Sequence, residues 1–260
     1  MNKLEFEMID ILKRLKHDYH AIEVKSEFEA EGSRIEEMMR LKDVTSNLEL
    51  PLILKIGGVE ALTDVYNGLL IGVSTLIAPM AESKFAVKKY IEMVKNYVAE
   101  DNQNDLKFYI NIETKLASQN FDDILSLENI NHLHGVTVGR HDMCSSMSLP
   151  TSEIESSDAL HNTVLSVLKR AKAKHLATGI GGKITSKSIP RLQEYIDKDL
   201  LDKFETRKIV FSKECINNAP QAINLALEFE LLWLQSKKRY YSGVSKQDDE
   251  RINQLNERLK

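Results

Sequence analysis

Short runs typical of β-strands alternate with longer helical runs along most of this chain. The short runs are rich in valine, isoleucine or aromatic residues and are bounded by glycine, proline or polar residues. In ESKFAVKKYIEMVKNYVAE, by contrast, hydrophobic residues such as Val87, Ile91 and Val94 recur at helical spacing. This alternation predicts a parallel sheet, because a parallel crossover needs a connection of helix length. The predicted strands are residues 21–24, 51–56, 75–80, 107–112, 135–139, 175–180 and 207–212.

Two architectures fit seven or eight strand–helix units: an open doubly wound sheet and a closed (β/α)8 barrel. The length of 260 residues favours the barrel, whose usual size is about 250 residues. We therefore predict an α/β fold with a single (β/α)8 TIM-barrel domain. Because only seven strands are evident, the remaining strand is expected to be atypical or missing at the N-terminus, where LEFEMIDIL indicates a helix.

The predicted elements divide the chain into three parts. These are an N-terminal helix at 1–19, a barrel domain that would hold the active site at 20–240, and a polar C-terminal helical tail at 241–260. YYSG predicts a break after the long helix around NLALEFELLWLQSKK, and DDERINQLNERLK predicts a polar helix that lies on the surface or serves in an oligomer. Trp233, among leucines, indicates packing in the core or in an oligomer.

Composition excludes several classes of partner. The net charge of -4 and the pI near 6.0 leave no basic field for nucleic acid or for an anionic membrane surface. Two cysteines are too few for a disulfide framework and favour a reducing compartment. MNKLEFEMIDILKRLK has no uninterrupted apolar core of a signal peptide, and no apolar stretch approaches the ~20 residues that span a bilayer. We expect a soluble cytoplasmic protein.

Carboxylates follow two consecutive predicted strands, at the strand ends where barrel enzymes place their reactive groups. Glu113 follows 107–112, and Asp142 follows 135–139. Neighbouring strands lie ~4.8 Å apart, so both carboxylates can share one cation, and Mg²⁺ often binds one or two carboxylates plus water and substrate oxygens. An aspartate after a strand can instead cap a helix or shape a turn. Because Glu113 occupies the corresponding position after the preceding strand, we favour a pair of metal ligands over a capping role for Asp142.

Alternation along the strands predicts which side chains enter the barrel. In KFYINIE, Glu113 shares a face with Tyr109 and Asn111, so it should point into the barrel mouth. The same count along the predicted strand 51–56 places Lys55 inside the barrel, on the face opposite to Leu52 and Leu54. In AIEVKSEFE it groups four charged residues on one face: Glu23, Lys25, Glu27 and Glu29. Such charges must be paired, because an isolated buried charge is expensive.

Two sequence segments carry a resemblance to a known family. NIETKLASQNFDDI, followed by INHLHGVTVGRHDMCSSMS, resembles the HpcH/HpaI aldolase and citrate lyase beta-subunit family of the phosphoenolpyruvate/pyruvate barrel superfamily. In that family one strand ends in Ile-Glu-Thr and the next in Gly-x-x-Asp-(Leu/Met), and each supplies one metal ligand. Here the patterns are Ile112-Glu113-Thr114 and Gly139-Arg140-His141-Asp142-Met143, and LIAPMAESKFAV is similar to another family segment.

The resemblance covers about residues 20 to 235 and implies a (β/α)8 barrel with Mg²⁺ or Mn²⁺ on Glu113 and Asp142. It implies a carbon–carbon lyase or aldolase that forms an enolate from a pyruvate-like 2-oxo acid, with the metal as Lewis acid. A carboxylic acyl thioester is the alternative substrate class. The resemblance also implies a homo-oligomer, either a trimer or a hexamer.

The chain departs from the family pattern at two positions. The family has a Glu-His pair after an early strand, whereas SEFEAEGSR offers Glu27 and Glu29 without a histidine, which makes both acid–base candidates. Where the family has an arginine at the next strand end, this chain has Lys55, which keeps the charge but loses the two-pronged hydrogen bonding. Arg140 is the candidate to replace that guanidinium, and Gly139, Lys55 and Arg140 form the predicted substrate-binding set.

Three functions therefore stay open: a 2-oxo acid lyase, an acyl-CoA lyase of the citrate or malate type, and a barrel that binds metal and carboxylate as a partner subunit without turnover. Two smaller features also have two interpretations. His141 either moves protons near neutral pH or lies at the surface. The glycines at 179, 181 and 182 either bind an anion through backbone N–H groups or form a turn.

Overall fold

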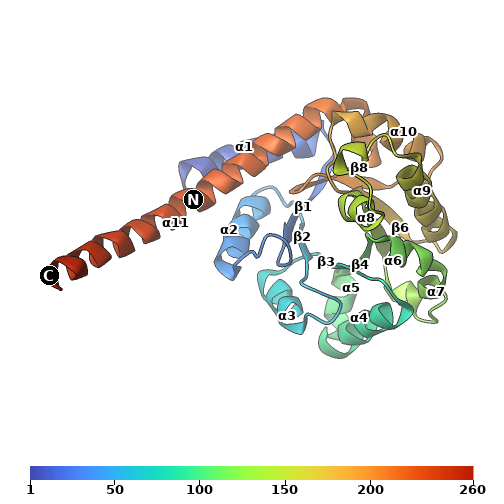
Figure 1. The fold of residues 1–260 in the computed structure, drawn as a ribbon, viewed down its shortest axis with the longest axis horizontal. Coiled ribbons are helices and arrows are strands. Elements are labelled where there is room, and N and C mark those ends of the chain that lie inside the picture. Colours follow the sequence, from blue (N-terminus) through green and yellow to red (C-terminus); the bar gives the residue numbers. More distant parts are fainter. Residues whose placement is uncertain (260) are drawn as a thin grey trace.

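A computed structural model of the chain describes residues 1–259 as a closed barrel of eight strands, each neighbouring the next in sequence order. Helices surround the barrel, and one long helix projects away from it (Figure 1). The fold prediction of a single (β/α)8-type barrel is confirmed. The strands are β1 Ala21–Glu27, β2 Leu52–Lys55, β3 Thr75–Ala78, β4 Lys107–Ile112, β5 Gly135–Gly139, β6 Ala177–Gly181, β7 Lys203–Glu205 and β8 Ile209–Ser212.

Helices follow or precede the strands as the alternation predicted. The first begins with a capping box, in which the Asn2 side chain accepts from the Glu5 N–H and the Glu5 carboxylate accepts from the Asn2 N–H. The helices are α1 Lys3–Asp18, α2 Ile35–Ser46, α3 Leu62–Ile71, α4 Lys84–Tyr97, α5 Glu100–Asp105, α6 Lys115–Gln119, α7 Phe121–Leu125, α8 Arg140–Ser146, α9 Asp158–Ala173, α10 Ile189–Asp197 and α11 Ala219–Arg258. Short 3-10 turns lie at Ile130–His132, Thr151–Glu153, Ser186–Ser188 and Lys213–Asn218.

The strand missing from the sequence prediction is β7, and placing it at the N-terminus was wrong. β7 has three residues, and two of them, Lys203 and Glu205, are charged, so no hydrophobic run marks it. β8 runs antiparallel to both β7 and β1, whereas β1 to β7 pair in parallel. The β7–β8 turn at 206–208 therefore lies at the carboxyl ends of the parallel strands.

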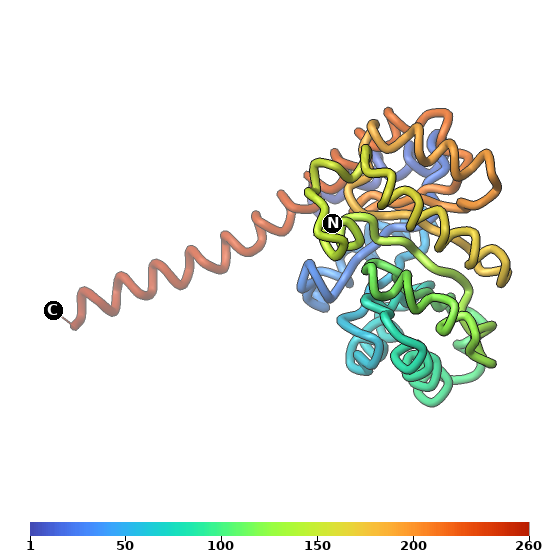
Figure 2. The backbone as a smooth tube through the Cα atoms, turned by 45° about the vertical axis from the view of Figure 1, so that its right-hand side comes forward, coloured from blue at the N-terminus to red at the C-terminus, as the bar shows by residue number. Residues whose placement is uncertain are grey.

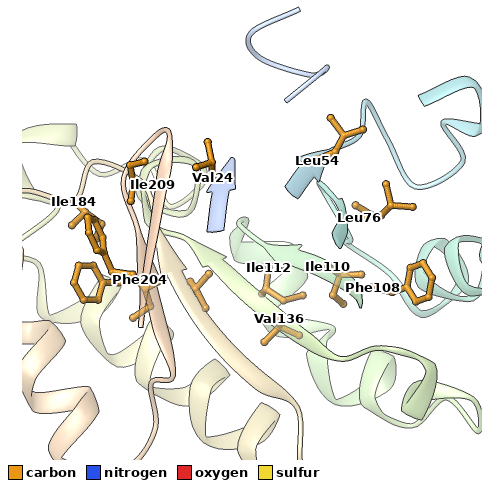
Figure 3. Packing of buried hydrophobic residues seen from close by; sticks show 14 of the residues in the cluster. Val24, Leu54, Leu76, Phe108, Ile110, Ile112, Val136, Ile184, Phe204 and Ile209 are labelled. Carbon is orange, nitrogen blue, oxygen red and sulfur yellow. The ribbon is translucent and has the colours of Figure 1, made fainter. Parts of the chain in front are cut away.

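The barrel wall separates two buried regions. Outward-facing strand residues such as Phe108, Ile110 and Ile112 pack against the helices in the main hydrophobic core (Figure 3). Inside the barrel a small apolar cluster consists of Ile53, Ile77, Tyr109 and Val210. Each strand therefore divides its alternate side chains between core and interior, as the parity count predicted for β4.

Ion pairs fill the interior beyond this cluster, as the count of charged positions required. Lys203 Nζ lies 3.0 Å from Glu23 Oε2, and Lys25 pairs with Glu205. Glycines on β6 make room for these long side chains. A Cβ at Gly181 would lie 2.8 Å from Glu205 Oε1, too close for any ordinary contact.

Helix α11 runs unbroken through the YYSG segment, so the break predicted there is absent from the described chain. Its first half packs against α1 and buries Phe229 and Trp233, whereas every residue from Ser242 to Leu259 is exposed (Figure 2). Gly243 costs a helix about 1 kcal/mol relative to alanine, which its neighbours can offset. Among residues 1–259, no helix is both long and apolar enough to cross a membrane.

Candidate active site

A cavity of roughly 600 Å³ opens at the carboxyl ends of the parallel strands. Residues from β1, β2, β4, β5, β6 and β7 line it, together with the starts of the loops and of the helix that follow them. The structure brings six of the seven predicted site residues to this cavity: Glu27, Glu29, Lys55, Glu113, Gly139 and Asp142.

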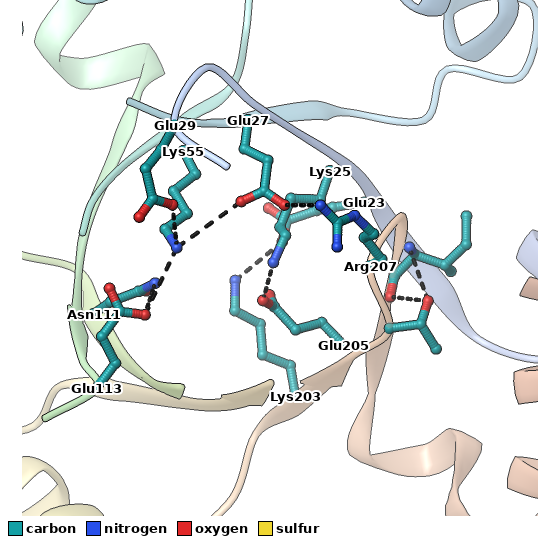
Figure 4. Close-up of polar contacts among 12 residues, drawn as sticks. Glu23, Lys25, Glu27, Glu29, Lys55, Asn111, Glu113, Lys203, Glu205 and Arg207 are labelled. Atoms are coloured by element: carbon teal, nitrogen blue, oxygen red, sulfur yellow. Dashed lines mark hydrogen bonds and ion pairs between the residues drawn. The ribbon is translucent and has the colours of Figure 1, made fainter. Parts of the chain in front are cut away.

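Lys55 lies at the centre of a group of carboxylates (Figure 4). Its Nζ is 2.7 Å from Glu29 Oε2, 3.7 Å from Glu113 Oε2 and 3.9 Å from Glu27 Oε2. Burial acts to lower the pKa of Lys55, but the three carboxylates outweigh burial and raise that pKa above its usual value. Lys55 is therefore a permanent cation at neutral pH, suited to binding an anion rather than to accepting a proton.

Glu113 is almost fully buried and held by two donors. The Met80 backbone N–H donates to Oε1 at 2.9 Å, and Asn111 Nδ2 donates to Oε2 at 3.1 Å. Burial and the nearby Asp142 charge raise the pKa of Glu113 against the lowering effect of Lys55 and the two donors. The carboxylate is thus fixed in direction and sits where a further positive charge would stabilise its ionised form.

Asp142 does not act as a helix cap. It lies in the first turn of α8, whose N-cap is Gly139, and no side chain caps that end. Within residues 1–259 the Asp142 carboxylate has neither a hydrogen bond nor an ion pair, although it lines the cavity. The turn or capping explanation for this aspartate therefore has no support in the structure.

Two glycines bring α8 close to its neighbours. A Cβ at Gly139 would lie 2.7 Å from both Cβ and Oε2 of Glu113, so glycine allows β5 to pass directly beside that carboxylate. Gly182 has a positive φ of 85°, and a Cβ there would lie 2.5 Å from the backbone nitrogen of His141. Both glycines therefore help to set Asp142 against the cavity.

The donor set fits a Mg²⁺-type cation. Among the described residues there is no cluster of three or more histidine, cysteine, aspartate or glutamate side chains that could hold a metal. Glu113 and Asp142 both line the cavity and offer two carboxylates, and Mg²⁺ accepts such sparse coordination when water and substrate supply the other oxygens. The buried Asn111 Oδ1 has no hydrogen-bond partner and lines the same cavity, so a third hard oxygen is available.

Arg140 is the predicted site residue that the structure does not bring to the cavity. Its guanidinium donates to Glu155 Oε2 at 3.0 Å and Oε1 at 3.1 Å, and to Ser188 Oγ at 3.0 Å. The side chain is buried among these partners and fastens the start of α8 to the loops behind it. Arg140 therefore cannot share an anion with Lys55 in this arrangement.

The β7–β8 turn contributes a guanidinium that the sequence analysis missed. Arg207 lines the cavity, with Nε 3.1 Å from Glu31 Oε1 and Nη2 3.9 Å from Glu27 Oε1. Beside it, Lys208 is buried and paired with Glu31, and burial lowers the pKa of Lys208. Only the reversal of β8 places this turn at the mouth, and no sequence signal marked that reversal.

His141 and the glycine cluster also meet the cavity. His141 lines it, and its Nδ1 is buried without a hydrogen-bond partner in the described chain. Gly181 and Gly182 line the cavity as well, while a Cβ at Gly179 would lie 2.9 Å from Thr137 Oγ1 inside the barrel. Close packing thus accounts for these glycines, and an anion on their N–H groups stays a prediction.

No protein family model matches the sequence, and no curated protein matches it. Solved structures do match. The citrate synthase SbnG aligns with 15% identity over 86% of this chain and 89% of its own, with a TM-score of 0.61. The HpcH/HpaI aldolase from Desulfitobacterium hafniense DCB-2 aligns with 12% identity over 77% and 82% of the two chains, with a TM-score of 0.60.

A third structure is the citrate lyase beta subunit from M. tuberculosis, complexed with oxaloacetate and magnesium. It aligns with 15% identity over 83% of this chain and 92% of its own, with a TM-score of 0.53. Identities this low establish the fold. The chain has the barrel fold of HpcH/HpaI aldolase and citrate lyase beta-subunit structures, the same proteins that its Glu113 and Asp142 motifs resemble.

Proposed function

We propose that this protein is a divalent-metal-dependent carbon–carbon lyase or aldolase that acts through the enolate of a pyruvate-like 2-oxo acid. The observation that carries the proposal is the pairing of Glu113, held by two donors, with the unpartnered carboxylate of Asp142 in one cavity. These two residues would hold Mg²⁺ or Mn²⁺. When bound, the cation supplies a Lewis acid for the negative charge that develops on the substrate oxygen.

Lys55 supplies the positive charge for the substrate carboxylate. Its ammonium already lies within 4 Å of carboxylate oxygens of Glu27, Glu29 and Glu113. A bound carboxylate can therefore replace Glu29, the most exposed of the three. A lysine binds as a point charge and does not fix the plane of the carboxylate. Orientation would then come from the oxygens on the cation.

Glu29 is the proposed proton-transfer residue. It lies on the loop after β1, lines the cavity and is more exposed than Glu27, so it can approach a substrate while its partner Lys55 stays in place. Glu27 is held between Lys55 and Arg207, each at 3.9 Å, and serves to position both cations. A carboxylate base at this position replaces the histidine that the family pattern would supply.

Calorimetric titration with Mn²⁺ tests the metal site. Glu113→Gln and Asp142→Asn should each weaken binding by at least about tenfold, because each removes a negative ligand from a site with only two. Asp105→Asn, at an exposed helix end far from the cavity, is the matched control and should bind as the wild type does. Unchanged Mn²⁺ affinity in both Glu113→Gln and Asp142→Asn would refute the proposal.

Exchange of the pyruvate methyl protons with deuterium, followed by NMR, separates turnover from binding alone. Exchange that requires Mg²⁺ or Mn²⁺ demonstrates enolisation, and Glu29→Gln should slow it by about 100-fold or more if Glu29 transfers the proton. Metal binding without exchange of pyruvate or oxaloacetate protons would favour the non-catalytic partner subunit. Retention of acetyl-CoA in equilibrium dialysis would favour the acyl-CoA lyase.

A further inference from the structure

Helix α11 has a second hydrophobic face that is largely exposed; of its positions, Leu227 lines the cavity and Tyr241 donates a hydrogen bond to Glu37 of α2. Leucine or isoleucine occupies six positions on it with exposed fractions from 41% at Leu255 to 84% at Leu259. The face follows a line of positions spaced alternately by four and three residues, here called the seam: 227, 231, 234, 238, 241, 245, 248, 252, 255 and 259. The exposed aliphatic residues fall on both ends of the seam: Leu227, Leu231 and Leu234, then Ile252, Leu255 and Leu259. A 4–3 spacing is the heptad pattern of a coiled coil.

Polar residues occupy the middle of the seam. They include Lys238 and Asp248, which are ten residues apart along one helix and so cannot contact each other within one chain. The segment from Ser242 to Leu259, the end of α11 with its C-cap residue, is here called the arm; it projects beyond the barrel (Figure 2), and every residue in it is exposed. A helical arm of this kind gains most of its stability from packing against another element.

We propose that α11 pairs with α11 of a second copy of this chain as an antiparallel coiled coil. The end of one arm then covers the exposed leucines at the base of the other helix. The seam layers are Leu259 on Leu227, Leu255 on Leu231 and Ile252 on Leu234, followed by Asp248 on Lys238 and Ser245 on Tyr241. Two-fold symmetry, with its axis level with residue 243, repeats every layer.

Charge fixes both the orientation and the register. A parallel pairing would oppose Lys238 to Lys238 and Asp248 to Asp248 inside the seam, where like charges are expensive. An antiparallel shift by one heptad would oppose Lys238 to Leu255 in one direction and Asp248 to Leu231 in the other. Only the proposed register matches both charges and all six aliphatic positions.

The flanking positions agree with this register. Glu230 of one copy comes beside Arg258 of the other, an attractive pair next to the seam. Lys237 would face Arg251, but Lys237 is already paired with Glu37 of its own chain at 3.0 Å. Leu227 and Glu230 also line the cavity, so the end of the second arm would lie along one edge of the cavity mouth.

Sedimentation of the full-length protein over about a hundredfold concentration range tests the pairing. We expect the wild type to associate. Lys238→Glu and Asp248→Lys should each raise the dissociation constant by about 30-fold or more, because each places two like charges in the seam. The double variant Lys238→Glu/Asp248→Lys exchanges the charges across the same layers and should return to within about threefold of the wild type.

Lys246→Glu makes the same charge change one position outside the seam and is the control that should not alter association. Because Cys144 and Cys215 are buried, introduced cysteines report the orientation: Leu234→Cys/Ile252→Cys should form a covalent dimer on oxidation, and Ile252→Cys alone should not. A monomer at every concentration, no rescue in the double charge variant, or cross-linking through Ile252→Cys alone would each overturn the proposal.

Discussion

Lys55 is a buried cation that balances three carboxylates at the cavity. Its partners Glu27 and Glu113 are even more buried than Lys55, so the cation and its anions depend on one another. Alternation along β2 and β4 predicted that Lys55 and Glu113 would share the interior. The same reasoning could not orient Arg140, because Glu155 and Ser188, which hold its guanidinium, lie in loops whose course no pattern in the sequence defines.

Removal of the Lys55 charge should destabilise the fold more at high pH than at low pH. Lys55→Met is expected to cost about 3–5 kcal/mol, as for other buried pairs broken from one side. Without Lys55 the pKa of Glu113, already raised, rises further. An acid whose pKa is higher in the folded state than in the unfolded state costs stability once the pH exceeds its unfolded pKa.

Urea denaturation at pH 5 and pH 8 measures this loss. The loss of stability in Lys55→Met should be larger at pH 8. At that pH Glu113 ionises freely in the unfolded chain, whereas its ionisation is unfavourable at the buried position in the folded variant. Lys88→Met, at a solvent-exposed helix position, should change stability little at either pH. Equal losses at both pH values in Lys55→Met would show that Glu113 does not depend on Lys55.

Gly139→Ala should weaken metal binding at the proposed site without unfolding the barrel. Its backbone φ is -85°, which alanine adopts freely, so the added Cβ acts only by pushing against Glu113. We expect Mn²⁺ affinity to fall by at least about tenfold. Gly58→Ala, whose Cβ would meet nothing within 4 Å, is the control in the same titration, and equal affinities of the two variants would contradict the steric explanation.

At the scale of elements, this barrel differs from a regular (β/α)8 barrel in its β7–β8 hairpin, where β8 runs antiparallel to its neighbours. Strands with a continuous hydrophobic run were predicted from the sequence, because buried parallel strands need apolar residues on their outward face. β7 was not predicted, because only Phe204 faces the core. Its other two residues, Lys203 and Glu205, form ion pairs with Glu23 and Lys25 inside the barrel. The direction of β8 was equally hidden, because alternation gives the faces of a strand and not its direction.

Thr206 should hold this hairpin in place. The Ile209 N–H donates to its Oγ1 at 3.2 Å, and its own N–H donates to the Ile209 carbonyl at 2.9 Å. Thr206→Val keeps the shape but removes the buried acceptor, so the free energy of unfolding should fall by about 1–2 kcal/mol. Thr163→Val, which alters a half-buried helical threonine whose hydrogen bond is exposed, should cost less in the same urea titration, and faster hydrogen exchange at the Ile209 amide should appear only in Thr206→Val.

At the scale of the whole molecule, strand–helix alternation and length were enough to predict a barrel, because few architectures accommodate so many parallel crossovers. The cavity followed from the fold, since parallel strands end at one face. The final helix was predicted as two pieces, but the alternation could not predict that it starts from a reversed strand or that it continues unbroken past the YYSG segment.

Metal binding should stabilise the entire domain, because the two proposed ligands, Glu113 and Asp142, follow different strands and come together only when the barrel is closed. Free Mg²⁺ at about 100 times its dissociation constant should add about 2.7 kcal/mol, which raises the melting temperature by several degrees for a domain of this size. Asp142→Asn should show no such rise in a thermal scan. A rise of equal size in that variant would place the stabilising ion elsewhere.

In a regular barrel the helix after the last strand returns toward the amino ends of the strands. Here β8 already runs in that direction, and the Lys213 N–H donates to the Asp202 carbonyl at the start of β7, so α11 begins behind the barrel and rises toward the cavity. The reversal of one short strand thus changes the side of the molecule to which its last helix leads. A fluorophore or fused domain attached at the end of that helix would therefore be held well away from the barrel (Figure 2), where it would leave the cavity mouth of its own chain open.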